Sequence, residues 1–312
     1  MNVILLGATS FIGINLAIKL SERKDVHLTL VDAKDEYFET IRKLNLPNTI
    51  FKVCTFSDET DFNSLLEKQD IVYHLVSTTI PSTSNQHIYI EIKANIDVTA
   101  LLLDACVQNN IKQLIFFSSG GAVYGKENKC PLKEETPTYP ITSYGIQKIT
   151  IEKLIYLYNY MYGLDYRVVR LSNPYGPYQR PNGILGAVNT FIYRALKKEE
   201  IVVYGDGSVI RDFIYIDDAI AAVIRLSDST TKQKTFNIGS GKGTSINELL
   251  GEIKKTLNLD LNIKYTEGRK IDVPVNYLDV SKYEKYYGKI STNTLSDGVV
   301  KTANFIKQFY GL

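Results

Sequence analysis

The stretch SYGIQK (143–148) places a tyrosine and a lysine four residues apart, at the predicted start of a helix. Side chains at positions i and i+4 share one helix face, so Tyr144 and Lys148 are expected about one turn apart. A tyrosine hydroxyl, with its ordinary pKa of about 10, is a poor base at neutral pH, but a neighbouring ammonium stabilises the phenolate and lowers that pKa. The pair therefore predicts a general base and the lysine that activates it. Ordinary helix packing is the competing interpretation, because the chain has 22 tyrosines.

Two hydroxyl groups end the apolar run QLIFFSS (113–119) further upstream. The run predicts a buried strand, with Ser118 and Ser119 at its carboxyl end. A serine hydroxyl at that place would complete a set with the tyrosine and the lysine, since ligands of parallel sheets bind outside the carboxyl ends of the strands. Both serines are candidates for the third catalytic group.

The stretch GATSFIG (7–13) follows a predicted strand and opens a predicted helix. A tight backbone at this place lets N–H groups and the helix N-terminus meet a pyrophosphate. The residues expected at this contact are Gly7, Ser10, Phe11, Ile12 and Gly13. Serine stands where the usual motif has its middle glycine, and its hydroxyl is able to bond a phosphate oxygen. The alternative is a glycine that only lets a helix pack closely on a strand.

An acidic residue ends the second predicted strand, VHLTLVD (26–32). The carboxylate of Asp32 is placed to bond both hydroxyl groups of an adenosine ribose and would repel a 2′-phosphate. The order strand, turn, helix, strand and terminal Asp therefore predicts a site for NAD in preference to NADP. The positive nicotinamide ring of NAD⁺ would add to the effect of Lys148 on the Tyr144 hydroxyl.

Alternating strands and helices must position these groups. Apolar runs predict strands at 2–7, 26–32, 50–56, 70–77, 113–119 and 165–172, and helical spacing predicts helices at 11–21, 61–68, 87–109 and 143–162. Buried strands separated by helices are typical of a doubly wound parallel sheet, so we expect an α/β protein of the Rossmann type. We expect an NAD-binding domain over 1–172. A smaller substrate-binding region over 173–312, partly interleaved with the first, is expected to mix loops and short helices, with a final helix from about Ser296.

The composition excludes several classes of protein. The chain has 312 residues and a net charge of +2 without a basic run, so neither nucleic acid nor an anionic membrane is an expected partner. Three cysteines without paired spacing and only three histidines argue against disulfides and against a metal site. The first residues lack the basic region of a signal peptide, and no apolar stretch is long enough to span a membrane. A cytoplasmic enzyme is therefore expected.

Together these stretches resemble the extended short-chain dehydrogenase/reductase family, in particular NAD-dependent sugar-nucleotide epimerases and dehydratases of the UDP-glucose 4-epimerase type. The resemblance covers nearly the whole chain and includes GATSFIG, Asp32, VYHLVS, FFSSGGAVYG, SYGIQK, RLSNPYGP, VYGDGSVIRDFIYIDD and GRKIDVPVNYLD. It implies a tightly held NAD, a site for a uridine diphosphate sugar, and a homodimer formed through helices at about 88–109 and 144–162.

By position, the resemblance implies that Tyr144 is the catalytic base and Lys148 its partner. The family's usual serine or threonine falls on Gly120 here, so Ser119 is the first choice for the hydroxyl and Ser118 the second. Further residues implied to line the cofactor are Leu75, Val76, Ser77 and Asn95.

The second half of the chain carries the implied diphosphate site. Asn173, in SNPYGP, is implied to contact a sugar or phosphate oxygen. Arg211 and Arg269 are implied to clamp the diphosphate, because arginine presents a planar fork to phosphate oxygens. Asp272 is implied to bond the uridine ribose, beside Ile271 where relatives often have glycine. A surface ion pair is the competing interpretation for each arginine.

Four further positions are implied to contact the two ends of the substrate. Val202 and Tyr204 are implied to flank the uracil. Asn276 stands where some relatives carry a bulky aromatic residue, which favours room for an N-acetyl group. Arg180, in GPYQRP, is placed to face a sugar carboxylate.

The favoured function is therefore a 4-epimerase of a UDP-hexose, either glucose and galactose or their N-acetylated amino sugars, with a role in polysaccharide supply. The alternatives are a 4-keto-sugar reductase and a UDP-glucuronate 4-epimerase with the same catalytic set. A 4,6-dehydratase is disfavoured because such relatives carry Asp-Glu where this chain has Gly121 and Ala122, and a UDP-glucuronate decarboxylase is disfavoured because the glutamate it uses is also missing. A non-catalytic NAD-binding scaffold is the alternative of another class, kept open by Gly120 and Ser10.

Overall fold

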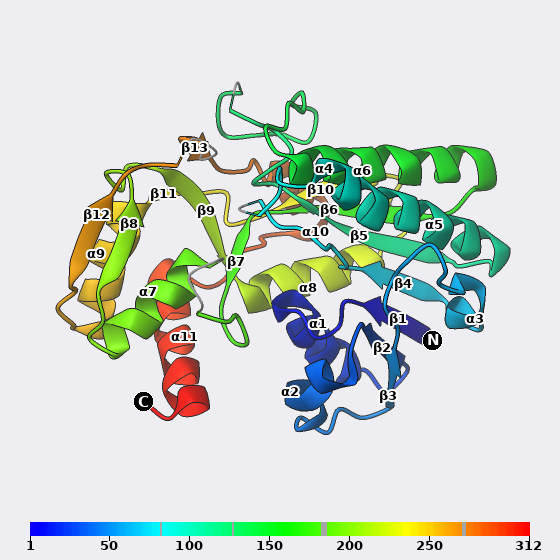
Figure 1. Ribbon diagram of the computed structural model, residues 1–312, viewed down its shortest axis with the longest axis horizontal. Helices are drawn as coiled ribbons and strands as arrows, with labels where there is room; N and C mark the ends of the chain where they lie inside the picture. The colour runs from blue at the N-terminus through cyan, green and yellow to red at the C-terminus, as the bar shows by residue number, and fades with distance from the viewer. Residues whose placement is uncertain (82, 127, 182–185, 270–272) are drawn as a thin grey trace.

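Seven parallel strands form the centre of the protein, as a computed structural model shows (Figure 1). The structure describes residues 1–81, 83–126, 128–181, 186–269 and 273–312. The strands lie in the order β10, β6, β5, β4, β1, β2, β3. Their bounds are β1 Asn2–Leu6, β2 His27–Asp32, β3 Thr49–Val53, β4 Ile71–His74, β5 Gln113–Ser119, β6 Tyr166–Leu171 and β10 Thr235–Ile238. The α/β class predicted from the sequence is confirmed, and the strand order reverses between β1 and β4, where such sheets bind ligands.

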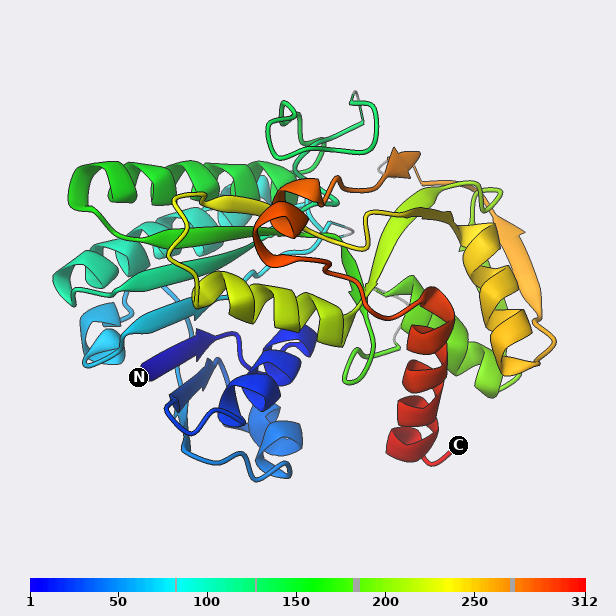
Figure 2. The ribbon, with the colours of Figure 1, turned by 180° about the vertical axis from the view of Figure 1, so that it is seen from behind.

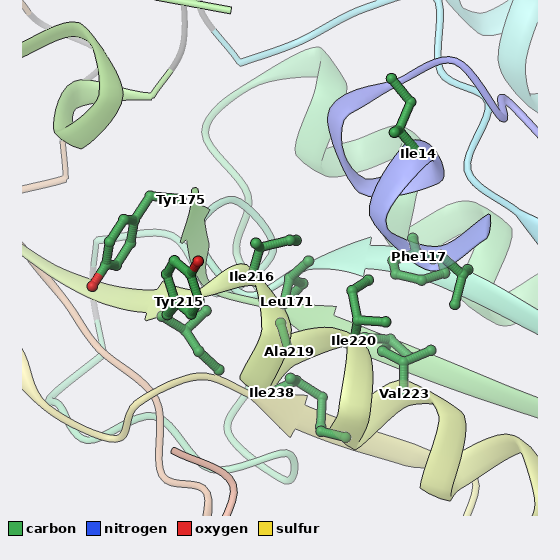
Figure 3. Close-up of a cluster of buried hydrophobic side chains, with 14 of the residues drawn as sticks. Ile14, Phe117, Leu171, Tyr175, Tyr215, Ile216, Ala219, Ile220, Val223 and Ile238 are labelled. Carbon is green, nitrogen blue, oxygen red and sulfur yellow. The ribbon is translucent and has the colours of Figure 1, made fainter. Parts of the chain in front are cut away.

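Helices cover both faces of this sheet (Figures 1 and 2). One face carries α1 (Phe11–Ser21), α8 (Ile216–Ser227) and α10 (Ser281–Tyr287), and the other carries α3 (Phe62–Leu66), α5 (Val98–Gln108) and α6 (Ser143–Tyr162). Side chains alternate along each strand, so Phe117 packs in the core with α1 and α8, shown in Figure 3, while Phe116 packs with α5 and α6. Burial on both faces explains why the strands are continuous apolar runs. The short η1 (Asp35–Phe38) and α2 (Glu39–Arg42) connect β2 to β3.

The long helix predicted over 87–109 contains an irregular turn. It consists of α4 (Ile88–Ile92), the π-helical η2 (Lys93–Asp97) and α5. A π-helical turn inserts an extra residue into the helical ladder and often occurs at functional sites. Asn95 lies in this turn and is buried. Apolar spacing alone predicted a regular helix, because the polar bonds that surround Asn95 come from other segments.

Apart from β10, α8 and α10, which belong to the large sheet and its layers, the second half of the chain forms two small sheets and three helices among the residues described. One sheet contains β7 (Asn173–Tyr175), β9 (Ile210–Tyr215), β11 (Gly243–Ser245) and β13 (Val275–Asn276), and the other pairs β8 (Ile201–Tyr204) with β12 (Ile263–Thr266). The helices are α7 (Ala187–Leu196), α9 (Ile246–Leu257) and α11 (Leu295–Tyr310). The structure contains the predicted helices, and the final one begins at Leu295, next to the predicted start at about Ser296. The small sheets were missed, since these strands are too short to show a clear period in the sequence.

The two halves of the chain are interleaved in space. The strand β10 and the helix α8 follow residue 172, yet they complete the seven-stranded sheet and one of its covering layers. The division into domains at 172 and 173 stays a prediction. Among the residues described, no helix combines the length and apolar character needed to cross a membrane. Over the same residues, no group of three or more His, Cys, Asp or Glu side chains is placed to hold a metal ion.

Candidate active site

Tyr144 and Lys148 lie in the first two turns of α6, at the carboxyl edge of the sheet. The side chain of Thr142 caps this helix by accepting a hydrogen bond from the Gly145 N–H at 3.1 Å. Lys148 is only 4% exposed, and its Nζ donates a hydrogen bond to the Phe117 carbonyl oxygen at 2.9 Å. The same Nζ lies 5.5 Å from the centre of the Tyr144 ring. The predicted spacing of the pair is thus realised, with the ammonium behind the half-buried tyrosine.

Burial dominates the titration of both groups. It raises the pKa of Tyr144 to about 12, and a hydrogen bond with Ser119 acts in the opposite direction. Burial lowers the pKa of Lys148 to about 8, and the charge of Glu152 opposes this shift. The pKa shift at Tyr144 is therefore opposite to the one expected from the pair alone. Removing a phenolate from water costs more free energy than the interactions with its neighbours supply.

The structure separates the two serine candidates. Ser119, the last residue of β5, lies within hydrogen-bonding reach of Tyr144. Ser118 is buried, and its Oγ donates to the Glu152 carboxylate at 2.5 Å. Position 120 has no room for a side chain, because an added Cβ at Gly120 would lie 2.6 Å from Leu278 Cδ1 and 3.2 Å from the Arg170 carbonyl oxygen. The family's usual hydroxyl therefore cannot occupy this position without displacing Leu278.

A buried hydrogen-bond network joins the segment after β4 to α6. The Asn95 side chain accepts from the Thr78 N–H at 2.9 Å and donates to Gln147 Oε1 at 2.8 Å. Gln147 in turn donates to the Glu91 carboxylate at 3.2 Å and to the Ser143 hydroxyl at 2.8 Å. Sequence reasoning found Asn95 but missed Thr78, Glu91 and Gln147. The only available signal was a polar residue at 147 on the inner side of an amphipathic helix.

The glycine turn between β1 and α1 is as tight as predicted. Gly7 has a φ of +85°, a conformation that favours glycine. A Cβ at Gly13 would lie 2.5 Å from the Gly7 carbonyl oxygen and 2.7 Å from that of Ala8. Ser10 caps α1: its hydroxyl donates to the Gly7 carbonyl at 2.8 Å and accepts from the Gly13 N–H at 3.1 Å. The Ser10 hydroxyl is thus engaged inside the turn, where the sequence suggested a phosphate contact.

Asp32 lies at the end of β2 beside this turn. Its Oδ2 accepts from the Thr9 N–H at 3.0 Å and from the Thr9 hydroxyl at 2.7 Å, while its Oδ1 accepts from the Ala33 N–H at 2.8 Å. A carboxylate has about four acceptor positions, so it can still accept a bond from a ribose hydroxyl. Thr9, which sequence reasoning missed, fixes the carboxylate at the mouth of the turn.

These features fit an NAD molecule by their geometry. The first turn of α1 presents N–H groups without helical partners at Phe11 and Ile12, which suits a pyrophosphate. Close backbone packing at Gly13 and the carboxylate of Asp32 suit the rest of the adenosine half. The segment of Leu75 and Val76 passes against the turn, since an added Cβ at Gly7 would lie 3.3 Å from Val76 N. Ser77 follows, with its hydroxyl donating to the Thr79 carbonyl at 2.8 Å.

The predicted substrate residues fall into two groups in the second half. Asn173 on β7 donates to the Asp212 carbonyl at 3.1 Å, and Asn276 on β13 donates to the Gly120 carbonyl at 3.2 Å, beside β5. Arg211 on β9 donates to the Val273 carbonyl at 2.6 Å and is paired in register with Asn276. These three side chains therefore border the carboxyl edge that also carries Ser119.

The second group lies at the ends of β8 and β12. Val202 and Tyr204 lie on the same face of β8, and the Arg269 guanidinium stacks over the Tyr204 ring at 4.0 Å. Arg180 is exposed and its charge acts on Tyr310 at the end of α11. Asp272 and Ile271 lie outside the described residues. The roles of all these residues toward a substrate stay predictions.

A cavity of about 760 Å³ lies at the other edge of the sheet. Its lining includes Asp70, Lys112, Asp165 and Lys234, which precede β4, β5, β6 and β10. The carboxyl ends of the strands, where Tyr144 and Asp32 lie, face away from it. This cavity therefore does not belong to the candidate active site.

The chain is similar to known proteins along nearly its whole length. Residues 3–239 match the family described as the NAD dependent epimerase/dehydratase family. The chain is 26% identical over 309 residues to a UDP-glucose 4-epimerase of Mycolicibacterium smegmatis, which covers 98% of this chain and 99% of that protein.

Two solved structures share its fold over nearly every residue. The UDP-glucose 4-epimerase of Thermotoga maritima with UDP-glucose has a TM-score of 0.91 at 31% identity, covering 99% of this chain and 100% of that chain. The UDP-glucuronic acid 4-epimerase of Bacillus cereus, in complex with UDP-glucuronic acid and NAD, has a TM-score of 0.90 at 26% identity, with the same coverage.

Proposed function

Because the chain belongs to the NAD-dependent epimerase/dehydratase family, we propose that it is a 4-epimerase of a UDP-hexose. NAD, predicted from the glycine turn and Asp32, is the cofactor of this family. One observation carries the proposal: Tyr144, with Ser119 in reach and Lys148 behind it, lies at the sheet edge that also holds the glycine turn. Gly121 and Ala122 add no further acid or base after β5, so this set supports epimerisation better than dehydration.

The chain's own residues would transfer one proton and hold the sugar in its reactive orientation. When bound, NAD supplies the hydride acceptor and donor for C4 of the sugar. Tyr144 Oη takes the proton of the 4-hydroxyl and returns it after the 4-keto sugar has turned its other face. The Ser119 hydroxyl holds the same oxygen in place, and the Lys148 ammonium stabilises the phenolate during this transfer. The high pKa of Tyr144 in the protein alone makes this stabilisation necessary.

The second half of the chain supports a nucleoside diphosphate as the part of the substrate that the protein binds. Arg211 and Arg269 are the proposed partners of the diphosphate, with the Tyr204 ring and Val202 beside the base. Asn173 and Asn276 border the sugar. Asn276 is 1% exposed and its Oδ1 has no hydrogen-bond partner within the described residues, which leaves an acceptor for a sugar hydroxyl or amide.

Proton NMR of the purified protein tests this function. UDP-glucose, UDP-N-acetylglucosamine and UDP-glucuronate are incubated separately, first without and then with added NAD⁺. Appearance of the C4 epimer in one tube is the expected result and names the hexose. If all three sugars stay unchanged with NAD⁺ present, the 4-epimerase proposal for these hexoses fails and a 4-keto-sugar reductase becomes the better candidate.

Removing the two serine hydroxyls one at a time should have different effects. Ser119→Ala is expected to lower kcat by about 10²-fold, because a donor at the reacting oxygen is lost. Ser118→Ala is expected to lower the free energy of unfolding by about 2 kcal/mol, since its hydrogen bond goes to a buried carboxylate, with a much smaller effect on kcat. Steady-state kinetics and urea denaturation of both variants measure this. Equal losses of kcat would remove the distinction between the two serines.

We also propose that two copies of the chain associate through α4 to α6. Large apolar side chains are exposed on α4 and α6, among them Ile88, Tyr89, Ile90, Ile146, Leu157, Tyr160 and Met161. Several large apolar side chains exposed on neighbouring helices are typical of interaction sites in soluble proteins. A homodimer is expected in size-exclusion chromatography with light scattering, and Leu157→Glu is expected to convert it to monomer. A wild-type protein that is monomeric at micromolar concentration would contradict the proposal.

A further inference from the structure

A buried carboxylate lies one helical turn beyond Lys148. Glu152 is on the same face of α6, four residues later, and is 7% exposed. Its carboxylate accepts hydrogen bonds from Ser118 Oγ at 2.5 Å and from Arg170 on β6, whose Nη2 lies 2.7 Å and whose Nε lies 3.1 Å away. Glu152 therefore lies between two buried cations, one of which is bonded to it directly.

Arg170 is itself held from several sides. Its Nη1 donates to the Tyr124 hydroxyl at 3.0 Å and to the Glu134 carbonyl at 3.0 Å. Tyr124 donates onward to Asn237 Oδ1 at 2.7 Å. Burial raises the pKa of Tyr124 to about 12, so this phenol stays neutral. Because a guanidinium does not lose its proton in proteins, Arg170 remains a positively charged hydrogen-bond partner of the Glu152 carboxylate.

The remaining groups around Lys148 give it no other anion among the described residues. From β4, His74 is buried and neutral, with its pKa lowered to about 3, partly by the charge of Lys148. From β5, the Phe117 carbonyl accepts from Nζ and the Phe116 ring lies 4.8 Å away. From α4, Glu91 bonds Gln147, on the neighbouring position of α6. Tyr144 is neutral in the protein alone.

We propose that Glu152 is a positioning residue which, held by Arg170, keeps Lys148 an ammonium behind Tyr144. The inference rests on the proposed role of Lys148 as the partner of Tyr144. Lys148 and Arg170 each carry a positive charge, and Glu152 carries the negative charge between them. Of the two cations, only Lys148 can lose its proton at moderate pH. Without the Glu152 charge, Lys148 and Arg170 would both remain buried without this anion, and the lysine would be the group that neutralises.

The pH dependence follows from this arrangement. Lys148 is cationic below its folded pKa of about 8 and loses its charge as the pH rises through that value. In Glu152→Gln the lysine faces the Arg170 charge without compensation, so its titration midpoint is expected to fall by about 1 unit or more. In the double variant Glu152→Gln/Arg170→Met both charges are gone, and the midpoint is expected between those of the wild type and Glu152→Gln. Glu152→Asp keeps the negative charge, so its Lys148 midpoint is expected to stay close to that of the wild type.

The direct test is NMR of the full chain with ¹³Cε-labelled lysine, without substrate. The Lys148 signal is assigned by its loss in Lys148→Met and titrated from pH 6 to 10. The Lys148 midpoint is expected to be highest in the wild type, lower in the double variant and lowest in Glu152→Gln. The alkaline limb of the pH profile of kcat should move in the same order in any variant that turns over. Equal midpoints in all three proteins would overturn the inference. The double variant removes the Arg170 charge together with that of Glu152, so it provides the comparison even if Glu152→Gln does not fold.

The readout separates this inference from the proposed function. If the midpoints shift in the expected order and no nucleotide sugar is converted, Glu152 still controls the charge of Lys148, and only the 4-epimerase proposal fails. If a sugar is converted and the variants lose turnover equally at every pH without a shift of the limb, Glu152 has a purely structural role. That result would overturn the inference while leaving the proposed function intact.

Discussion

Replacing Tyr144 with phenylalanine is expected to lower kcat by about 10²- to 10⁴-fold while the protein keeps its NAD. The substitution removes one oxygen, the proposed carrier of the proton of the sugar hydroxyl. It leaves the ring in place over Lys148, where the ammonium lies 5.5 Å from the ring centre. The lost hydrogen bond to Ser119 is expected to cost about 1 kcal/mol of stability, so the variant should fold.

Turnover of the nucleotide sugar identified by NMR measures the first effect, and absorbance of the nucleotide released on denaturation measures the second. Tyr286→Phe is the matched control, since Tyr286 is an exposed tyrosine on α10 away from the catalytic edge, and it should leave kcat unchanged. Normal turnover in Tyr144→Phe would remove Tyr144 from the mechanism. Loss of NAD together with turnover would show instead that the hydroxyl is needed to hold the cofactor.

Adding a single methyl group at Gly13 should abolish cofactor retention. The new Cβ of Gly13→Ala would lie 2.5 Å from the Gly7 carbonyl oxygen and 2.7 Å from the Ala8 carbonyl oxygen. Both atoms belong to the backbone of the turn, so α1 must move away from β1. Overpacking of this kind costs about 1–3 kcal/mol and would shift the N–H groups expected to face the pyrophosphate.

Urea denaturation and the amount of co-purified NAD measure the outcome. Gly251→Ala is the control, because this glycine is inside α9 and an added Cβ meets no atom within 4 Å. Alanine has the higher helix propensity, so the control should gain up to about 1 kcal/mol of stability. If Gly13→Ala binds NAD as the wild type does, close packing at this position is not what shapes the turn.

The sequence predicted the parts of the site that depend on neighbours along the chain. The spacing of Tyr144 and Lys148 fixed their shared helix face, and the strand-turn-helix pattern placed Gly7 and Gly13 at the end of β1. The same pattern put the strands in a parallel sheet, because buried strands separated by helices leave few other arrangements.

The remaining parts depend on contacts between distant segments. Ser118 and Ser119 differ only in which face of β5 they present, and Leu278, far along the chain, fills the space at Gly120. The ion pair of Glu152 and Arg170 joins a helix to a neighbouring strand, and the local sequence of neither stretch predicts it. The sequence predicted a lowered pKa for Tyr144, whereas burial raises it, because the spacing reveals the ammonium but not the depth of burial.

The interleaving of the two halves has a consequence for protein engineering. A chimera that exchanges everything after residue 172 for the same part of a relative would replace β10 and α8, and with them one edge of the sheet and most of one layer. A fragment ending there would leave β6 as an open edge, which invites association with other chains. The link from Asn276 to the Gly120 carbonyl would also have to be rebuilt. New sugar specificity is therefore better sought by grafting individual side chains on β7, β8 and β13 than by swapping a module.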